Sequence, residues 1–283
     1  MGISQKVKET LEKEELGPED LKNEKIIVAL SGGKDSAVTA YILKKLGYNI
    51  EGLHINLNVG KYSQDCLEAI KKLCNILDIK LHIYDLKEEQ GKSMKYFWER
   101  IKSQKRLTTC SICGVFKKWI LNKKTRELKA EKIATGHNLD DEAQTVLINF
   151  FKGSLNLSEN SGVITKESEG NYEKFVPRIK PLFHIPEKEI LKFAKTKKLP
   201  IVEGSCPNAE ESYRIQVRKF LRKVSNKEKE NILKNFQKIT KEKHDKNKSS
   251  PLKFCKGCGE PSKGELCKKC ELEKIAKTKR IDE

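Results

Sequence analysis

Cysteine is the residue type whose number and spacing in this sequence most clearly suggest chemistry. The chain has nine cysteines, and six of them form three C-x2-C pairs: Cys110 with Cys113, Cys255 with Cys258, and Cys267 with Cys270. The first fifteen residues are too highly charged for a signal peptide, so we expect a reducing compartment. Paired cysteines in such a compartment indicate metal or redox chemistry rather than a disulfide framework.

The last four cysteines have the spacing of a structural zinc site. Eight residues separate Cys258 from Cys267, so two C-x2-C pairs supply four thiolates at short separation. Four thiolates close a tetrahedral set around Zn²⁺ and leave no open position for catalysis. Lysines surround these ligands and suggest that this zinc finger also contacts RNA phosphates: Lys253, Lys256, Lys263, Lys268 and Lys269.

Cys110 and Cys113, together with Cys206, form a second candidate metal site. Three cysteines cannot close a tetrahedral zinc site, but they can hold a four-iron cluster and leave one iron without a protein ligand. For a C-x2-C pair alone, a chance occurrence or a shared structural zinc site is the alternative. A further alternative is a set of cysteines that cycles through a persulfide and a disulfide without any cluster.

The segment Ser31-Gly32-Gly33-Lys34-Asp35-Ser36 is a candidate anion-binding loop, because it follows an apolar run and begins a helical pattern. Its two glycines allow a tight turn, and the free N–H groups of the helix start then favour phosphate. The P-loop and dinucleotide-binding patterns are both absent. The structural alternative is an ordinary glycine turn in which Ser31 or Asp35 only caps the helix.

Strand and helix patterns alternate through the first two thirds of the chain. Nearly continuous apolar strands separated by helices predict an α/β fold, with a parallel sheet covered on both faces. The expected strands are 25–30, 49–56, 80–86 and 132–135, and 175–183 could add a last strand despite Pro177 and Pro181. The expected helices are 3–16, 36–46, 63–77, 92–105, 111–128, 140–151, 187–197, 210–224 and 227–241.

Two polar stretches interrupt this alternation. Residues 158–171 read as a mobile surface loop, and 242–251 as a linker that leads to the last four cysteines. We therefore divide the chain into an N-terminal helix at 1–24, a catalytic domain at 25–185, a basic helical region at 186–250 and a zinc-finger tail at 251–283.

Positive charge is concentrated near the C-terminus. The net charge is +18, and residues 186–283 hold 27 Lys and Arg against 15 Asp and Glu. Such a field attracts RNA or DNA through counterion release, although a lysine-rich solvated surface is the alternative. No apolar run is long enough to span a membrane, so we expect a cytoplasmic protein without a membrane partner.

With its loop at 31–36, the sequence resembles the PP-loop ATP pyrophosphatases, whose SGGxDS loop binds the pyrophosphate of ATP. Within this superfamily three further segments resemble the tRNA 2-thiolation enzymes: Cys110 to Cys113 followed by Lys117, the run GHNLDDEAQT at 136–145, and GSCP at 204–207. The similarity covers about residues 20–225, and the cysteine tail makes it closest to the 2-thiouridine synthetases. Many relatives also carry an N-terminal zinc finger, which the cysteine-free residues 1–24 cannot form.

This resemblance implies an adenine nucleotide alpha-hydrolase-like, doubly wound parallel sheet with a helical C-terminal extension and a small four-cysteine zinc finger. It also implies a tRNA 2-thiouridine synthetase. ATP, with Mg²⁺, adenylates the uridine C2 carbonyl oxygen, a hydrosulfide held by the open iron of a 4Fe-4S cluster attacks C2, and AMP leaves. The expected partners are tRNA and a sulfur donor, either sulfide or a sulfur-carrier protein, and a homodimer is a candidate assembly.

The resemblance assigns catalytic roles to Asp141, Lys117 and the three cysteines Cys110, Cys113 and Cys206. Asp141 would order Mg²⁺ or the uridine, and Lys117 would steady phosphate or the attacking sulfur. The implied nucleotide-binding residues are Ala29, Ser31, Gly32, Gly33, Lys34, Asp35, Ser36, His54, Ile55, Gly136 and Asp141. Simpler interpretations are a helix cap for Asp141, a surface lysine for Lys117 and a packed core residue for His54.

Three other functions stay open on the sequence alone. One is a cluster-free persulfide tRNA thiolase, and another is a different PP-loop enzyme such as an amidating synthetase. The third, from another class, is an RNA-binding zinc module on a degenerate nucleotide fold. The intact loop at 31–36 argues against this last alternative. Neither the modified uridine, at the wobble position or in the T-loop, nor the sulfur donor follows from the residues.

Overall fold

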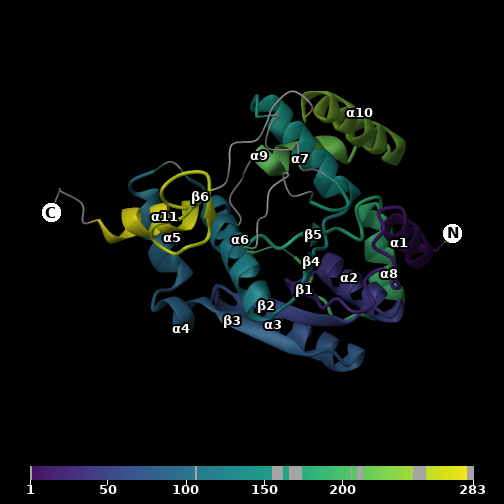
Figure 1. Cartoon of the computed structure of the whole chain (residues 1–283), viewed down its shortest axis with the longest axis horizontal. Coiled ribbons are helices and arrows are strands. Elements are labelled where there is room, and N and C mark those ends of the chain that lie inside the picture. Colours follow the sequence, from purple (N-terminus) through teal and green to yellow (C-terminus); the bar gives the residue numbers. More distant parts are fainter. Residues whose placement is uncertain are drawn as a thin grey trace.

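A five-stranded parallel sheet forms the centre of the protein. A computed structural model describes residues 2–105, 107–154, 162–165, 174–204, 206–208, 213–244 and 253–278. The strands are β1 (Ile26–Leu30), β2 (Ile50–Asn56), β3 (Leu81–Asp85), β4 (Lys132–Ala134) and β5 (Arg178–Ile179), in the order β3-β2-β1-β4-β5 (Figure 1). The chain therefore reverses its direction of winding between β1 and β4, where open α/β sheets bind ligands at the carboxyl ends of their strands.

Helices cover both faces of this sheet, as the doubly wound prediction requires. The helices are α1 (Ile3–Glu12), α2 (Lys34–Lys45), α3 (Gly60–Leu77), α4 (Leu86–Gln90), α5 (Met94–Lys102), α6 (Thr109–Glu127), α7 (Leu139–Phe151), α8 (Glu187–Thr196), α9 (Tyr213–Leu221), α10 (Asn226–His244) and α11 (Lys268–Lys277). A short antiparallel hairpin, β6 (Lys253–Phe254) and β7 (Pro261–Ser262), precedes α11.

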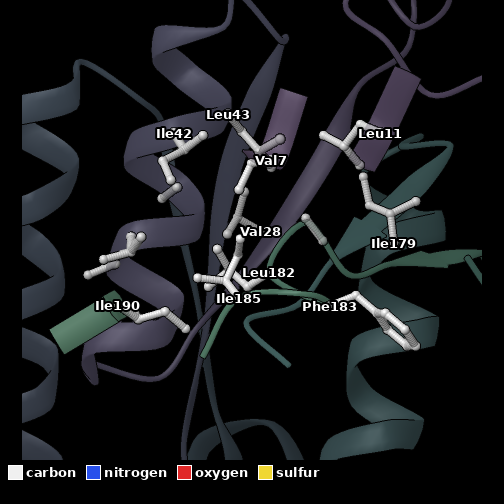
Figure 2. Close-up of a cluster of buried hydrophobic side chains, with 14 of the residues drawn as sticks. Val7, Leu11, Val28, Ile42, Leu43, Ile179, Leu182, Phe183, Ile185 and Ile190 are labelled. Carbon is white, nitrogen blue, oxygen red and sulfur yellow. The ribbon is translucent and has the colours of Figure 1, made fainter. Parts of the chain in front are cut away.

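The two faces of β1 contribute to separate cores, because successive side chains of a strand point in opposite directions. Ile26 and Val28 pack with α1, α2, α3 and α8, and this core is drawn in Figure 2. Ile27 packs on the other face with residues of α5, α6 and α11. Leu11 of α1 and Ile190 of α8 are fully buried in the first core, so both helices are integral to the sheet domain.

The C-terminal hairpin and α11 lie against α5 and α6, at the opposite end of the molecule from α1 (Figure 1). Leu272 and Ala276 of α11 are buried in the second core. The tail therefore packs on the helix that carries Cys110 and Cys113. Within the described residues, no helix is long and apolar enough to cross a membrane.

Most predicted elements are present, and the differences have local causes. The expected strand at 175–183 shortens to Arg178–Ile179, because Pro177 and Pro181 on either side cannot donate to a ladder. Helix α4 is absent from the sequence prediction; it begins at the cap Asp85, whose carboxylate accepts from the N–H groups of Lys87 and Glu88.

The two expected polar stretches are only partly described by the structure. Helix α10 continues to His244, so the prediction of a linker from 242 is wrong for its first three residues. The remainder, 245–251, lies outside the described residues. Of the expected loop at 158–171, the structure describes 162–165, where Ile164 forms an antiparallel bridge with Ile179. The other residues of that loop also lie outside the described part of the chain.

Candidate functional site

The loop between β1 and α2 has the geometry of an anion cradle. Gly32 has φ +85°, a left-handed conformation that L residues with side chains rarely adopt. The hydroxyl of Ser36 donates to the carbonyl oxygen of Gly33 at 3.0 Å and accepts from the N–H of Ser31 at 3.2 Å. These bonds close the loop over the first turn of α2, whose N–H groups have no partner within the helix. A phosphate fits this position.

Strand β4 ends directly against this loop. A Cβ atom on Gly136 would lie 2.7 Å from the backbone carbon of Asp35, so only glycine fits there. The side chain of Asn138 donates to Oδ1 of Asp35 at 3.1 Å and accepts from the N–H of Asp141 at 3.0 Å. One side chain therefore joins the loop to the first turn of α7 and brings Asp141 towards Asp35.

Asp141 lies in an environment that disfavours its charge. Desolvation, followed by the charge of Asp35, raises the pKa of Asp141 from its ordinary value to about 6. The guanidinium of Arg218 in α9 lies 3.4 Å from Oδ1 of Asp141 and opposes this shift. A carboxyl with a pKa near 6 can take up or release a proton near neutral pH.

Lys34 is paired with carboxylates in this structure. Its amine lies 2.8 Å from Oε1 of Glu187 at the start of α8 and 3.0 Å from Oδ2 of Asp35. Desolvation lowers the pKa of Lys34, but these two carboxylates outweigh it and raise the pKa above its usual value. No sequence pattern pointed to Glu187, because the contact joins residues far apart in the chain.

His54 lies at the carboxyl end of β2, beside β1. Its Nδ1 is 3.0 Å from the carbonyl oxygen of Leu30, which assigns the ring proton to Nδ1. Burial lowers the pKa of His54, so its ring is neutral. Within the described residues its Nε2 is buried without a hydrogen-bond partner, and it can accept a hydrogen bond from a ligand. Ala29 and Ile55, on the same two strand ends, are partly buried in the second core.

The three predicted cluster cysteines come from two segments that the fold brings together. Cys110 is exposed in the first turn of α6, and Cys113 lies one turn further on. Two hydrogen bonds fix the segment around Cys206: the N–H of Val202 donates to the carbonyl oxygen of Gly32 at 2.9 Å, and the hydroxyl of Thr109 donates to that of Asn208 at 2.8 Å. Cys206 therefore lies between the anion loop and the start of α6.

The pKa of Cys113 depends on the other two cysteines. Burial, together with the nearby Cys110 and Cys206, raises the pKa of Cys113. The indole N–H of Trp98, which donates to the sulfur at 3.2 Å, and the charge of Lys117 both act in the opposite direction. The three sulfurs do not all lie within 4.8 Å of one another in the described structure.

The four tail sulfurs are closer together and fit a single tetrahedral ion. The Sγ atoms of Cys255, Cys258, Cys267 and Cys270 all lie within 4.8 Å of one another. Cys258 and Cys267 are 3.6 Å apart, close to the ~3.8 Å that a tetrahedron with Zn–S bonds of about 2.3 Å requires. The N–H of Cys267 donates to the sulfur of Cys255 at 3.1 Å, as expected for a thiolate ligand.

Side chains on one face of α6 contact the tail and hold it in place. The indole N–H of Trp119 lies 3.4 Å from the sulfur of Cys258. Further along the helix, Arg126 forms an ion pair with the buried Glu260, which also accepts from Asn122 at 3.3 Å. The sequence analysis did not single out these residues. Their spacing of three and four positions places them on one face of the helix, which the sequence does show. The spacing does not reveal that this face contacts the tail.

Lys269 differs from the exposed lysines of the tail because its side chain packs on α6. Its side chain is 7% exposed, its amine lies 4.1 Å from the ring centroid of Trp119, and it pairs with Glu273 at 2.7 Å. Lys269 therefore stabilises the contact between the tail and α6, and the contact of the tail lysines with RNA stays a prediction. Lys253, by contrast, is exposed.

Comparisons with known proteins agree with this geometry. A family model described as a PP-loop domain matches residues 2–228. The chain is 37% identical over 273 residues to a tRNA-5-methyluridine(54) 2-sulfurtransferase of Pyrococcus horikoshii, covering 95% of this chain and 84% of that protein. It is 31% identical to the tRNA 2-thiolation protein NcsA of Haloferax volcanii, covering 95% and 89%.

A solved structure resembles the whole arrangement. The U34-tRNA thiolase NcsA of Methanococcus maripaludis, solved with its 4Fe-4S cluster, superimposes with a TM-score of 0.76 at 31% identity, covering 96% of this chain and 86% of that one. Fold, loop and sequence therefore define a PP-loop protein. The chain belongs to the PP-loop family and, within it, to the tRNA 2-thiolation proteins.

Proposed function

We propose that this protein is an ATP-dependent tRNA sulfurtransferase that converts a uridine into 2-thiouridine. The observation that carries the proposal is the position of Cys206. The hydrogen bonds Val202 to Gly32 and Thr109 to Asn208 hold it between an ATP-binding loop and two further cysteines. This geometry allows activation of a base and delivery of sulfur at one place. The names of the relatives from Pyrococcus horikoshii and Haloferax volcanii support the same activity.

The anion loop would bind the pyrophosphate portion of ATP. Gly32 and Gly33 let the phosphates approach the backbone, and the N–H groups at the start of α2 donate to them. The C2 oxygen of the uridine attacks the α-phosphorus, the bond to pyrophosphate breaks, and an adenylated base results. Asp141 and Asp35 would hold Mg²⁺ through their carboxylates, and Gly136 would leave room for the nucleotide.

His54 and the strand ends near it would bind the rest of the nucleotide. Within the described residues, Nε2 of His54 has no hydrogen-bond partner, so it is free to accept a hydrogen bond. An amino or hydroxyl group of the adenosine is a suitable donor. Lys34 would take part only after an exchange of partners, because its amine is paired with Glu187 and Asp35. A γ-phosphate or pyrophosphate can replace Glu187 in that pair.

Cys110, Cys113 and Cys206 would hold a 4Fe-4S cluster. When bound, such a cluster would supply one iron without a protein ligand, which could present a sulfur nucleophile to the base. Trp98 donates to Cys113 and stabilises its negative charge, and Lys117 adds a cation on the same side of α6. Sulfide attacks C2 of the adenylated base, the C2–O bond breaks, and AMP leaves. The solved NcsA of Methanococcus maripaludis, which contains a 4Fe-4S cluster, supports this assignment.

The tail would hold Zn²⁺ through Cys255, Cys258, Cys267 and Cys270. The mutual distances within 4.8 Å and the N–H···S bond to Cys255 suit a structural ion. Zinc would then stabilise the contacts of Trp119 and Arg126 with the tail.

The remaining partners and the setting are proposed on the same basis. The substrate would be tRNA, with sulfide or a sulfur-carrier protein as the donor, and the protein would act in the cytoplasm. A relative from Drosophila ananassae is named Cytoplasmic tRNA 2-thiolation protein 1 and supports this setting. It is 34% identical, over 89% of this chain and 74% of that protein. A homodimer stays a prediction.

The test is an anaerobic assay with purified protein, tRNA, ATP, Mg²⁺ and sulfide. We expect AMP and pyrophosphate to appear with 2-thiolated uridine in the digested tRNA, measured by mass spectrometry. Sequencing of the thiolated tRNA identifies the position, which is 54 in one relative's name and 34 in another's. Nucleotide turnover with no thiolated base would contradict the proposal.

A further inference from the structure

A group of positively charged side chains lies next to the catalytic site and has no role in the mechanism above. We call it the cation cluster; it consists of Lys118 of α6, Arg178 of β5, Lys180 directly after β5, and Arg214 of α9. Lys180, Arg214 and Arg178 lie near His137: desolvation, followed by the charge of Lys180, lowers the pKa of His137 to about 4, Arg214 and Arg178 act in the same direction, and Glu142 opposes them. His137 is therefore neutral and adds no charge of its own.

Arg178 is the member of the cluster that most clearly suits a ligand. The N–H of Arg178 donates to the hydroxyl of Thr165 at 2.9 Å, and Ile179 points into the first core. Alternation along the chain therefore places Arg178 and Lys180 on the same side. In the described part of the chain, Nε of Arg178 is buried and has no hydrogen-bond partner. A buried donor without a partner destabilises the folded protein unless a ligand supplies one.

Carboxylates neutralise only part of the charge of the other members. The amine of Lys180 pairs with Glu142 at 2.8 Å, and Arg214 donates to the neutral side chain of Gln144 at 2.9 Å. Lys118 has no ion pair among the described residues, and desolvation followed by the charges of Arg178 and Arg214 lowers its pKa. Asp141 at the edge of the cluster pairs with Arg218. The cluster thus keeps an excess of positive charge.

The position of the cluster separates it from the phosphates of ATP. The anion loop follows β1, whereas His137 follows β4, and Lys180 follows β5 at the edge of the sheet (Figure 1). Arg178 and Lys180 therefore come from a strand two positions away from β1 in the sheet. An anion here belongs to the second substrate. We propose that Lys118, Arg178 and Arg214 bind a backbone phosphate of the RNA strand beside the reacting uridine, an inference that rests on the proposed function.

Phosphate suits this site better than other anions. A guanidinium presents parallel N–H donors that match two phosphate oxygens, and a lysine adds charge without directional constraint. Contacts to phosphates fix the register of a nucleic acid without reading its sequence. The cluster would hold the strand so that the uridine reaches Asp141 and the cysteines.

The experiment measures binding of an unmodified tRNA transcript over a range of salt concentrations. Lys118→Gln and Arg214→Gln remove one charge each, and Lys72→Gln on the exposed face of α3 is the matched control. We expect each cluster variant to weaken tRNA binding about tenfold at low salt and to reduce the slope of log affinity against log salt by about one. The control should leave both values at those of the wild type.

A second arm separates the two sources of phosphate. Affinity for a non-hydrolysable ATP analogue should stay within about twofold of the wild type in both cluster variants, since the anion loop is intact. Unchanged tRNA affinity and salt slope in both variants would overturn the proposal, as would a selective loss of affinity for the ATP analogue. Wild-type protein that binds tRNA through these residues but never thiolates it would contradict the proposed function alone.

Discussion

The indole N–H of Trp98 in α5 donates to the sulfur of Cys113 in α6 at 3.2 Å. The bond crosses between two helices that pack in the second core, so it is fixed by tertiary structure rather than by local sequence. Hydrogen bonds to a cysteine sulfur stabilise its negative charge and tune the potential of a cluster bound to it. Trp98 therefore acts on the sulfur site without being one of its ligands.

Replacing Trp98 by Phe should retain the cluster and shift its reduction potential to a more negative value. Phenylalanine preserves most of the packing against α6 but removes the donor, so the reduced, more negative cluster loses stabilisation. An anaerobic redox titration followed by electron paramagnetic resonance measures this shift. Trp119→Phe is the matched control, because Trp119 donates to Cys258 in the tail. Equal potentials in wild type and Trp98→Phe would contradict the assigned role.

Replacing Cys255 by Ser should release the tail metal and detach the tail from α6. Zinc binding and local folding are coupled in small modules, with apparent energies on the order of 10 kcal/mol. We expect loss of zinc by metal analysis, increased hydrogen exchange in α11, and weaker tRNA binding. Binding of ATP should survive, because the anion loop belongs to the sheet domain and the tail packs on α5 and α6. If tRNA affinity stays at the wild-type value, the tail does not contact RNA.

The tail lysines should divide into two groups. Lys253 is exposed, whereas Lys269 is buried against Trp119. Neutralising Lys253 should remove up to about one phosphate contact. The slope of log affinity for tRNA against log salt should then become shallower by up to about one. Neutralising Lys269 should instead lower the thermal stability of the tail and leave the slope unchanged. A slope that changes only with Lys269 would show that the assignment is reversed.

Asp141→Asn should abolish thiolation and yet stabilise the protein at neutral pH. The folded-state pKa of about 6 lies above the ordinary value, so the folded state holds the proton more tightly than the unfolded chain. The associated stability is present below about pH 4 and is lost as the pH rises through about 6. At pH 7 the asparagine avoids this loss, which amounts to at most about 3 kcal/mol.

Denaturant unfolding without ATP or Mg²⁺ at pH 7 and at pH 4 measures this difference. The advantage of Asp141→Asn should be present at pH 7 and disappear at pH 4, where the wild-type carboxyl is protonated. An equal stability difference at both pH values would mean that the charge of Asp141 is not the cause.

Features encoded in short segments could be predicted from the sequence, and features that need distant contacts could not. The residues of the loop at 31–36 and the tail cysteines each lie close together in the sequence. Their arrangement could therefore be predicted from the spacing alone. By contrast, the ion pair between Lys34 and Glu187 joins residues 153 positions apart. The sequence could not show it, nor the contact between Arg126 and Glu260.

The position of Cys206 is an intermediate case. The family resemblance implied that it joins Cys110 and Cys113, but no local pattern explains how. The structure supplies the reason in two hydrogen bonds, from Val202 to Gly32 and from Thr109 to Asn208. The cation cluster was missed for a similar cause, because Lys118, Arg178 and Arg214 come from separate elements and each resembles an ordinary surface charge.

The most direct test of the proposed chemistry compares cluster content with thiolation in cysteine variants. Protein purified without oxygen should hold one 4Fe-4S cluster by iron and sulfide analysis and should thiolate tRNA with ATP and sulfide. Cys110→Ala, Cys113→Ala and Cys206→Ala should each lose both the cluster and the activity while the tail keeps its zinc, because two thiolates are too few to retain the cluster. Metal-free protein with intact cysteines that thiolates tRNA at the wild-type rate would contradict the account and favour a cysteine persulfide.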